Sequence, residues 1–538
     1  MDDLYLVNGR FYTQDPAHAR ASAVAIRAGR FWAVGSDDEI RAMAGPGARI
    51  IDLQGRRVIP GLTDSHFHYY DWALGRRRLT LGGVPTLAHL REQVAQASSA
   101  AAPGCWLIGQ GWNETIWPER RLPARADLDE VAPANPVFLW RNDLHLAVVN
   151  SQALQAAGIT ADTPNPPQGV IDRDSSGQPT GILRDLAINL VSNVIPDPPD
   201  KETTQAFKEG FAVLHSLGLT GVHDQRLMGG REGAAAFRAW QLLQTAREID
   251  LRVWMNIPGE RLSEAIALGL RTGLGDDYFR VGHCKYFADG AQGVHTAWML
   301  EPYEDANTTG LPLTPIAEIA EALRRAHSAG LAIAVHAIGD RANRELITVF
   351  EQALDDKEPA VAAPPRAPHR IEHVQIIRPQ DLERLARLGV VASMQPIQVT
   401  DDIPMMEPTI GSRARYAYTF RSMLDAGIPY TFNSDCPVCD PNPFWGIHAA
   451  VTRQRRDGTP PGGWHPEQRL TVAEAVWGFS MGAAVVSGRQ ADLGSISPGK
   501  LADLVVIDRD IFAIDPMEIA GARPVMTIFD GRVVYDAR

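Results

Sequence analysis

Eight short apolar runs in the middle of the chain constrain its fold more than any other feature. They are rich in β-branched residues and alternate with segments typical of amphipathic helices, such as IAEIAEALRRAHSAG before the fifth run. This alternation indicates βα units and a parallel sheet, and eight units predict an α/β fold of the (β/α)8 TIM barrel type. The predicted strands span residues 58–66, 219–224, 251–256, 281–290, 331–337, 370–374, 390–395 and 430–435.

Both ends of the chain follow a different pattern. Residues 1–58 and 490–538 contain short β-like runs separated by glycine turns, which is hairpin chemistry rather than a βα pattern. We therefore expect the two ends to pair into one small, discontinuous β-sandwich domain. The barrel, residues 59–489, would then be inserted between them.

Residues 75–205 separate the first predicted barrel strand from the second and are far too many for an ordinary βα connection. They contain further strand-like runs rich in tryptophan, such as CWLIGQGWN and PVFLWRND. A connection of this length must carry structure of its own. We expect an inserted lid or substrate-shaping subdomain, and the alternative is an element that serves an interface.

Composition excludes several classes of partner. The chain has 538 residues, with 52 Lys and Arg against 64 Asp and Glu, and its net charge is −12. It has no Lys- and Arg-rich block that could bind the phosphate backbone of a nucleic acid, so no nucleic-acid partner is expected. No apolar stretch approaches bilayer length, and polar residues follow the N-terminus too soon for a signal peptide, so we expect a cytoplasmic protein without a membrane partner.

The four cysteines are too few and too scattered for a disulfide framework, so reduced thiols are expected. Cys436 and Cys439 form a C-x-x-C pair, but no second pair completes a four-thiolate zinc site. The cysteines therefore are not expected to hold a metal.

Polar residues of metal-binding types recur at the carboxyl ends of the predicted strands, where the site of a βα barrel lies. Two histidines two residues apart at the end of the first strand would share one face. Each residue alone has another explanation, such as a salt bridge for the lysine, a helix cap for the aspartate or a hydrogen-bonded core histidine. Together they predict a metal site built from His66, His68, Lys285, His336, His373 and Asp435.

The same segments resemble the amidohydrolase superfamily and, within it, amidohydrolase family 3, the group that includes N-substituted formamide deformylases. The resemblance covers essentially the whole chain. It rests on the motifs PGLTDSHFH, KYFADGAQG, VHAIGDRAN, RIEHVQ, NSDCPV and SPGKLADLVVID. GWNE, LHLAVVNSQAL and GQPTGIL between residues 111 and 183 also look like the insert of that family.

The resemblance implies two divalent metal ions. His66, His68 and Asp435 would hold one, and His336 and His373 the other. A bridge between the two ions would come from Lys285 as N6-carboxylated lysine, because a carbamate offers two oxygens and a negative charge. A single-metal site with an unmodified lysine is the alternative. Zinc is the expected metal, although iron or manganese would also suit these ligands.

The implied reaction is hydrolysis of a C–N bond in an amide, an N-substituted formamide or a related small molecule. A metal-bridging hydroxide would attack the carbonyl carbon, and Asp435 would shuttle the proton to the leaving amine, unless it is a metal ligand only. Ester or lactone hydrolysis and deamination are alternatives, and so is a catalytically silent scaffold. Deamination is less favoured because Gly339 stands where ring deaminases of the superfamily carry a glutamate.

Substrate contacts are expected from the insert and from loops at the barrel mouth. The residues predicted to make them are Trp112, His145, Asp289 and Trp298. The resemblance also implies a homodimer.

Overall fold

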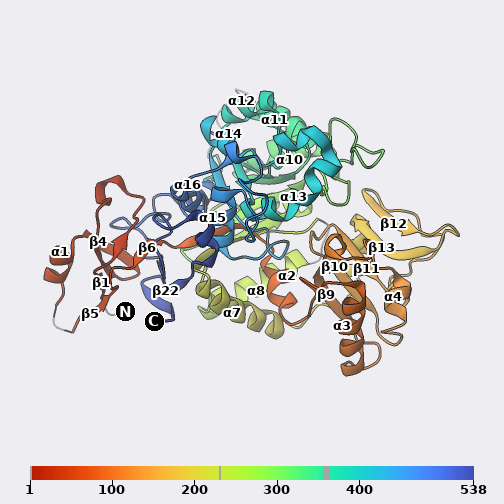
Figure 1. Cartoon of the computed structure of the whole chain (residues 1–538), viewed down its shortest axis with the longest axis horizontal. Coiled ribbons are helices and arrows are strands. Elements are labelled where there is room, and N and C mark those ends of the chain that lie inside the picture. Colours follow the sequence, from red (N-terminus) through yellow and green to blue (C-terminus); the bar gives the residue numbers. More distant parts are fainter. Residues whose placement is uncertain (1–2, 46, 229–231, 356–363) are drawn as a thin grey trace.

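A parallel eight-stranded barrel forms the centre of the computed structural model, which describes residues 3–45, 47–228, 232–355 and 364–538 (Figure 1). The strands follow each other around the sheet in chain order, and each neighbouring pair is parallel. An isolated parallel β-bridge between Phe67 and Cys436 connects the two edges of this sheet. The strands are β7 (Leu62–Phe67), β14 (Leu219–Asp224), β15 (Arg252–Pro258), β16 (Phe279–Phe287), β17 (Ile333–Ala337), β18 (Arg370–His373), β19 (Val391–Met394) and β20 (Tyr430–Phe432).

The TIM-barrel prediction is confirmed, but its first strand begins later than the sequence suggested. The run 58–66 is divided at Gly61: its first part belongs to β6 (Arg57–Pro60), which pairs with a strand near the C-terminus, and only β7 enters the barrel. A Cβ atom at Gly61 would collide with the side chain of Thr220 and lie 2.8 Å from Cβ of Asp503. Glycine is therefore required where the chain passes from one sheet to the other.

Amphipathic helices cover the outside of the barrel. In α10 (Ile316–Ser328), Ile319, Ala322, Leu323 and Ala326 are buried, which is the i, i+3, i+4, i+7 spacing of one helix face. The helix ends where Gly330 takes a left-handed φ of 76°. The other long helices around the barrel are α7 (Asp200–Ser216), α8 (Glu232–Ala246), α11 (Asp340–Asp355), α12 (Pro379–Ala386), α13 (Pro396–Ile410) and α15 (Pro443–Thr452).

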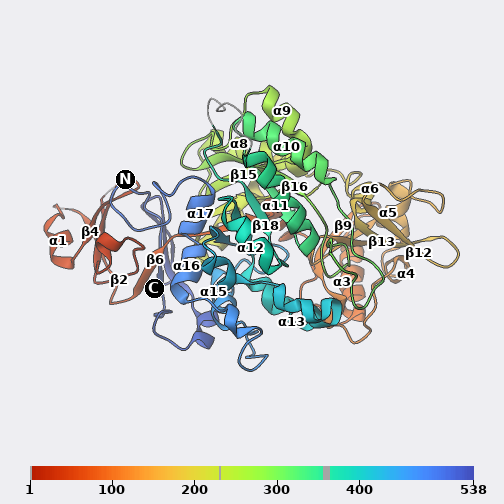
Figure 2. The same cartoon turned by 90° about the horizontal axis from the view of Figure 1, so that it is seen from above.

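Strands from the two ends of the chain pair with each other beside the barrel, where both termini lie (Figures 1 and 2). One sheet has the order β4-β3-β1-β5, and the other has the order β2-β6-β21-β22-β23. Apolar side chains from both ends share one core, as Leu6, Val58 and Ile528 illustrate. The strands are β1 (Leu4–Val7), β2 (Arg10–Phe11), β3 (Ala23–Arg27), β4 (Arg30–Gly35), β5 (Arg49–Asp52), β21 (Leu504–Ile507), β22 (Pro524–Phe529) and β23 (Arg532–Asp536).

The insert between β7 and β14 forms its own sheet, of order β12-β13-β11-β10-β9-β8, on the side of the barrel away from the termini (Figure 1). Its strands are β8 (Leu79–Thr80), β9 (Leu107–Trp112), β10 (Val137–Arg141), β11 (Leu146–Val149), β12 (Gly169–Arg173) and β13 (Pro179–Asp185), and its longest helix is α3 (Leu87–Ala100). The exact domain boundaries at 58, 75, 205 and 490 stay predictions. Within the described ranges, no helix is long and apolar enough to cross a membrane.

A buried ion-pair cluster ties the barrel to the terminal sheets. Arg252 of β15 lies 2.9 Å from each carboxylate oxygen of Asp503 and 3.0 Å from Asp530 Oδ1. All three side chains are less than a tenth exposed. Removing one partner of such a cluster leaves buried charge uncompensated, which costs far more than losing a surface pair.

Arg252→Leu should therefore lower the free energy of unfolding by about 3–5 kcal/mol. Urea denaturation followed by tryptophan fluorescence measures this. Arg77→Leu is the matched control, because Arg77 forms a solvent-exposed pair with Glu209; it should cost less than about 1 kcal/mol. Equal losses in the two variants would contradict the special role of the buried cluster.

Candidate metal centre

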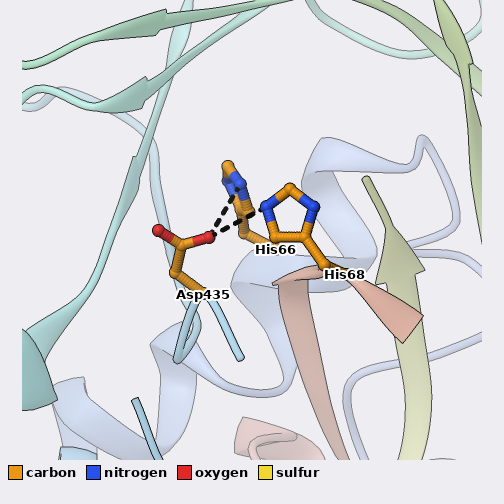
Figure 3. A group of neighbouring side chains, drawn as sticks. All are labelled: His66, His68 and Asp435. Carbon is orange, nitrogen blue, oxygen red and sulfur yellow. Dashed lines mark ion pairs between the residues drawn. The ribbon is translucent and has the colours of Figure 1, made fainter. Parts of the chain in front are cut away.

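The end of β7 and the loop after β20 bring two histidines and an aspartate together (Figure 3). Asp435 Oδ1 lies 3.2 Å from Nε2 of His66 and 3.2 Å from Nε2 of His68. The three side chains are buried, and their potential ligand atoms all lie within 4.8 Å of one another. Asp435 Oδ1 nevertheless forms no hydrogen bond within the described structure. A buried carboxylate oxygen facing two imidazoles without a hydrogen bond fits a cation among the three groups.

The other three predicted ligands lie beside this cluster. Lys285 of β16 places Nζ 3.5 Å from His66 Nε2. The ring of His373, at the end of β18, lies 5.2 Å from that of His66 and 4.3 Å from that of His336, on β17, between ring centroids. All six predicted residues line one pocket. The structure therefore brings together every metal ligand that the sequence predicts, while the binding role of each stays a prediction.

In the imidazole rings of His373 and His336, one nitrogen contacts a protein oxygen, which leaves the other nitrogen available for a metal ion. His373 Nδ1 lies 3.1 Å from Oε1 of Gln395, while its Nε2 is buried without a partner. His336 Nε2 lies 3.1 Å from the carbonyl oxygen of Gly290 and donates to it, which leaves Nδ1 with a lone pair. Metal-binding histidines usually donate their other ring N–H in this way.

Two of the candidate ligands have a left-handed backbone conformation. His373 has a φ of 72° and Asp435 a φ of 58°, and neither is glycine. Such conformations cost about 1–3 kcal/mol each and persist only where the surrounding structure enforces them, most often at functional sites.

Burial sets the charges of the cluster. It lowers the pKa of the His66, His336 and His373 imidazoles well below the usual value, so these rings are neutral. It also lowers the pKa of Lys285 to about 8. Burial alone would raise the pKa of Asp435, but His66 and His68 hold it below its usual value. Neutral imidazoles and an ionised carboxylate are the forms that bind metal ions.

The pocket above the cluster is a cavity of about 160 Å³ between the barrel and the insert. One face of α13 forms a wall, with Gln398, Asp402 and Met405 directed to the cavity at helical spacing. The insert contributes His145, whose Nδ1 lies 2.7 Å from Asp185 Oδ1 and whose ring lies 5.5 Å from that of His336.

Of the four residues predicted to contact substrate, His145 lines the pocket. Trp112 is fully buried in the core of the insert and donates its indole N–H to a backbone carbonyl. The Asp289 carboxylate lies beneath the pocket and accepts three backbone N–H groups, and burial raises its pKa to about 7. Trp298 packs under the guanidinium of Arg341. The last three are not among the described pocket-lining residues, and the substrate roles of all four stay predictions.

Sequence reasoning missed two residues that contact candidate ligands. Gln395 Oε1 lies 3.1 Å from His373 Nδ1, and Glu372 Oε2 lies 2.8 Å from His66 Nδ1. The available signal was the pair Arg370 and Glu372, two charged residues spaced to share one face of a predicted barrel strand. Charged side chains in such a strand need partners, which indicates a buried network.

The barrel with this residue set at the carboxyl ends of its strands defines a metal-dependent hydrolase of the amidohydrolase superfamily. A model of the amidohydrolase family matches residues 49–535, so the chain belongs to that family.

Individual relatives match over nearly the whole chain. It is 32% identical to "Protein LONG AFTER FAR-RED 3" of Arabidopsis thaliana, over 99% of this chain and 91% of that protein. It is 29% identical to an N-substituted formamide deformylase of Arthrobacter pascens, over 100% of this chain and 99% of that enzyme. An uncharacterised metal-dependent hydrolase from Pyrococcus horikoshii OT3 is structurally similar, with a TM-score of 0.77 and 25% identity over 96% of this chain and 99% of that one.

Proposed function

We propose that the protein hydrolyses a C–N bond of a small molecule, with an amide or N-substituted formamide as its substrate. The observation that carries the proposal is the gathering of four buried imidazoles, a buried lysine and the Asp435 carboxylate around one cavity. The full-length similarity to an N-substituted formamide deformylase supports this choice of bond.

The donor set suits two divalent cations. His66, His68 and Asp435 would hold the first, and His336 and His373 the second. Lys285, carboxylated on Nζ, would lie between them. When bound, such cations, for which we propose zinc, polarise a substrate carbonyl and make a water molecule more acidic.

Asp435 is placed beside the proposed metal site, where it could transfer a proton from the attacking water to the leaving amine. Its Oδ1 faces the ligand histidines, and its Oδ2 accepts a hydrogen bond from Gln398 Nε2 at 3.3 Å. An ionised carboxylate here can accept a proton from the attacking water and deliver it to the nitrogen of the departing amine. Amines need this proton to leave, which is why a C–N hydrolase requires such a group.

The charged groups of the pocket wall largely compensate one another. Arg141 is bound by both oxygens of Glu114 and pairs with Asp143. His145 lies 2.7 Å from Asp185 Oδ1, and burial raises the pKa of Asp402 to about 7. Bound divalent cations would therefore set the charge that the reacting end of a substrate meets.

A panel of small N-formyl amines, acetamides, activated esters and amino-substituted ring compounds tests this function on the zinc-loaded protein. Each acyl type is offered with a neutral, an ammonium or a carboxylate side group. We expect formamides or amides to be hydrolysed, and the side groups show which substrate charge the pocket accepts. Turnover of esters alone would favour the esterase alternative, ammonia release from ring amines would favour deamination, and no turnover on the loaded protein would favour a scaffold.

The binuclear site predicts about two divalent metals per chain. His373→Ala should reduce this content by about one and remove activity, because it deletes a proposed ligand of the second ion without touching the barrel's apolar core. Elemental analysis of purified protein measures the ratio. His89→Ala, an exposed histidine of α3, is the control and should change neither quantity. A wild-type ratio near one with full activity would reject the second ion.

A further inference from the structure

The buried carboxylate of Glu372 contacts the imidazole of His66, one of the candidate metal ligands. Glu372 of β18 is completely buried, and its Oε2 lies 2.8 Å from Nδ1 of His66. These two residues are 306 positions apart in the chain. The contact is on the ring edge opposite the pocket, because His66 Nε2 is the atom that lies close to Asp435 and Lys285.

The second oxygen of this carboxylate is fixed by a buried guanidinium. Arg370 Nε lies 2.6 Å from Glu372 Oε1, and both side chains are fully buried. One terminal nitrogen of Arg370 donates to the carbonyl oxygen of Ser65 at 2.9 Å and lies 3.2 Å from His223 Nδ1. The carboxylate is therefore held through both of its oxygens, by the ion pair with Arg370 and by the contact with His66.

We propose that Glu372 is a positioning residue of the metal centre, an inference that rests on the metal site of the proposed function. An imidazole that binds a metal through Nε2 carries its proton on Nδ1, and the Glu372 carboxylate 2.8 Å from Nδ1 is placed to accept that N–H. Nε2 is then left with its lone pair directed at the pocket. The same contact fixes the rotation of the ring, so that Glu372 selects both the tautomer and the orientation in which His66 can bind a metal.

The competing explanation is that Glu372 only neutralises Arg370. A single substitution cannot separate the two roles, because it also leaves a buried guanidinium uncompensated. Two double variants can: Arg370→Met with Glu372→Gln, and Arg370→Met with Glu372→Leu. Both remove the buried charges, but only glutamine keeps an oxygen that can accept the N–H of His66.

Zinc affinity is measured by competition with a chromophoric chelator, and stability by thermal unfolding of the metal-free proteins. We expect the leucine variant to bind zinc about 10–100-fold more weakly than the glutamine variant, with similar melting temperatures without metal. Equal zinc affinities would overturn the positioning role and leave the counter-ion role. If either double variant fails to fold, wild type is compared with Glu372→Asp, which keeps the negative charge beside Arg370 but shortens the side chain that reaches His66. Unchanged zinc affinity in Glu372→Asp overturns the proposal. Failure of wild type itself to bind zinc would instead contradict the proposed function.

Discussion

Lys285→Ala should lose at least about 10³-fold in turnover, because several kcal/mol of transition-state stabilisation depend on a correctly assembled metal pair. Short carboxylic acids such as formate or acetate should restore part of the activity, since they can occupy the space of the side chain and offer two oxygens to the cations. Turnover and metal content are measured with and without the acid. Rescue with restored metal content is the diagnostic result.

The geometry explains why this lysine is suited to carboxylation. Lys285 is 3% exposed, and its Nζ lies 3.5 Å from Nε2 of the candidate ligand His66. Burial lowers its pKa to about 8, so a substantial share of the amine is neutral near physiological pH and can add to carbon dioxide.

Lys208→Ala is the control for this experiment, because Lys208 forms a surface pair with Glu248 and should respond neither to substitution nor to added acid. Native mass spectrometry of the wild type should show one added carbon dioxide that the Lys285 variant lacks. Loss of activity without rescue, together with an unmodified wild-type mass, would remove the bridge from the proposed site.

The sequence was sufficient to predict the barrel and the position of its candidate ligands. The carboxyl ends of parallel strands meet at one end of a barrel, so residues as distant as His66 and Asp435 could be placed together without knowing any side-chain contact. The distance of 3.2 Å between His66 Nε2 and Asp435 Oδ1 agrees with that reasoning. The prediction succeeded because it needed only strand order and strand direction.

Contacts specific to side chains could not be predicted in this way. Glu372 lies in a predicted barrel strand, where a charged side chain needs a buried partner, but nothing in the sequence indicates that this partner is His66. Trp112 illustrates the same limit: a tryptophan in the tryptophan-rich insert suggests a substrate contact, its indole is fully buried in the core of the insert, and its substrate role stays a prediction. Residue type and spacing do not distinguish these cases, because burial depends on how the insert packs.

Asp435→Asn should retain most of the metal but lose at least about 10²-fold in turnover of an amide. Asparagine keeps one oxygen that can point to the ligand histidines, where Asp435 Oδ1 lies 3.2 Å from both Nε2 atoms. It cannot carry a proton at neutral pH. Turnover and metal content are measured on the same preparations, so that both proteins are compared at equal occupancy.

The choice of leaving group turns this variant into a test of mechanism. An amine must be protonated as it departs, whereas an activated phenol leaves as its anion and needs no acid. Asp435→Asn should therefore damage amide hydrolysis more than hydrolysis of an activated ester. Asp440→Asn in the same loop controls for local disturbance and should leave both rates unchanged. If Asp435→Asn slows both substrates equally, the carboxylate does not deliver the proton to the leaving group, and its role is confined to binding the metal.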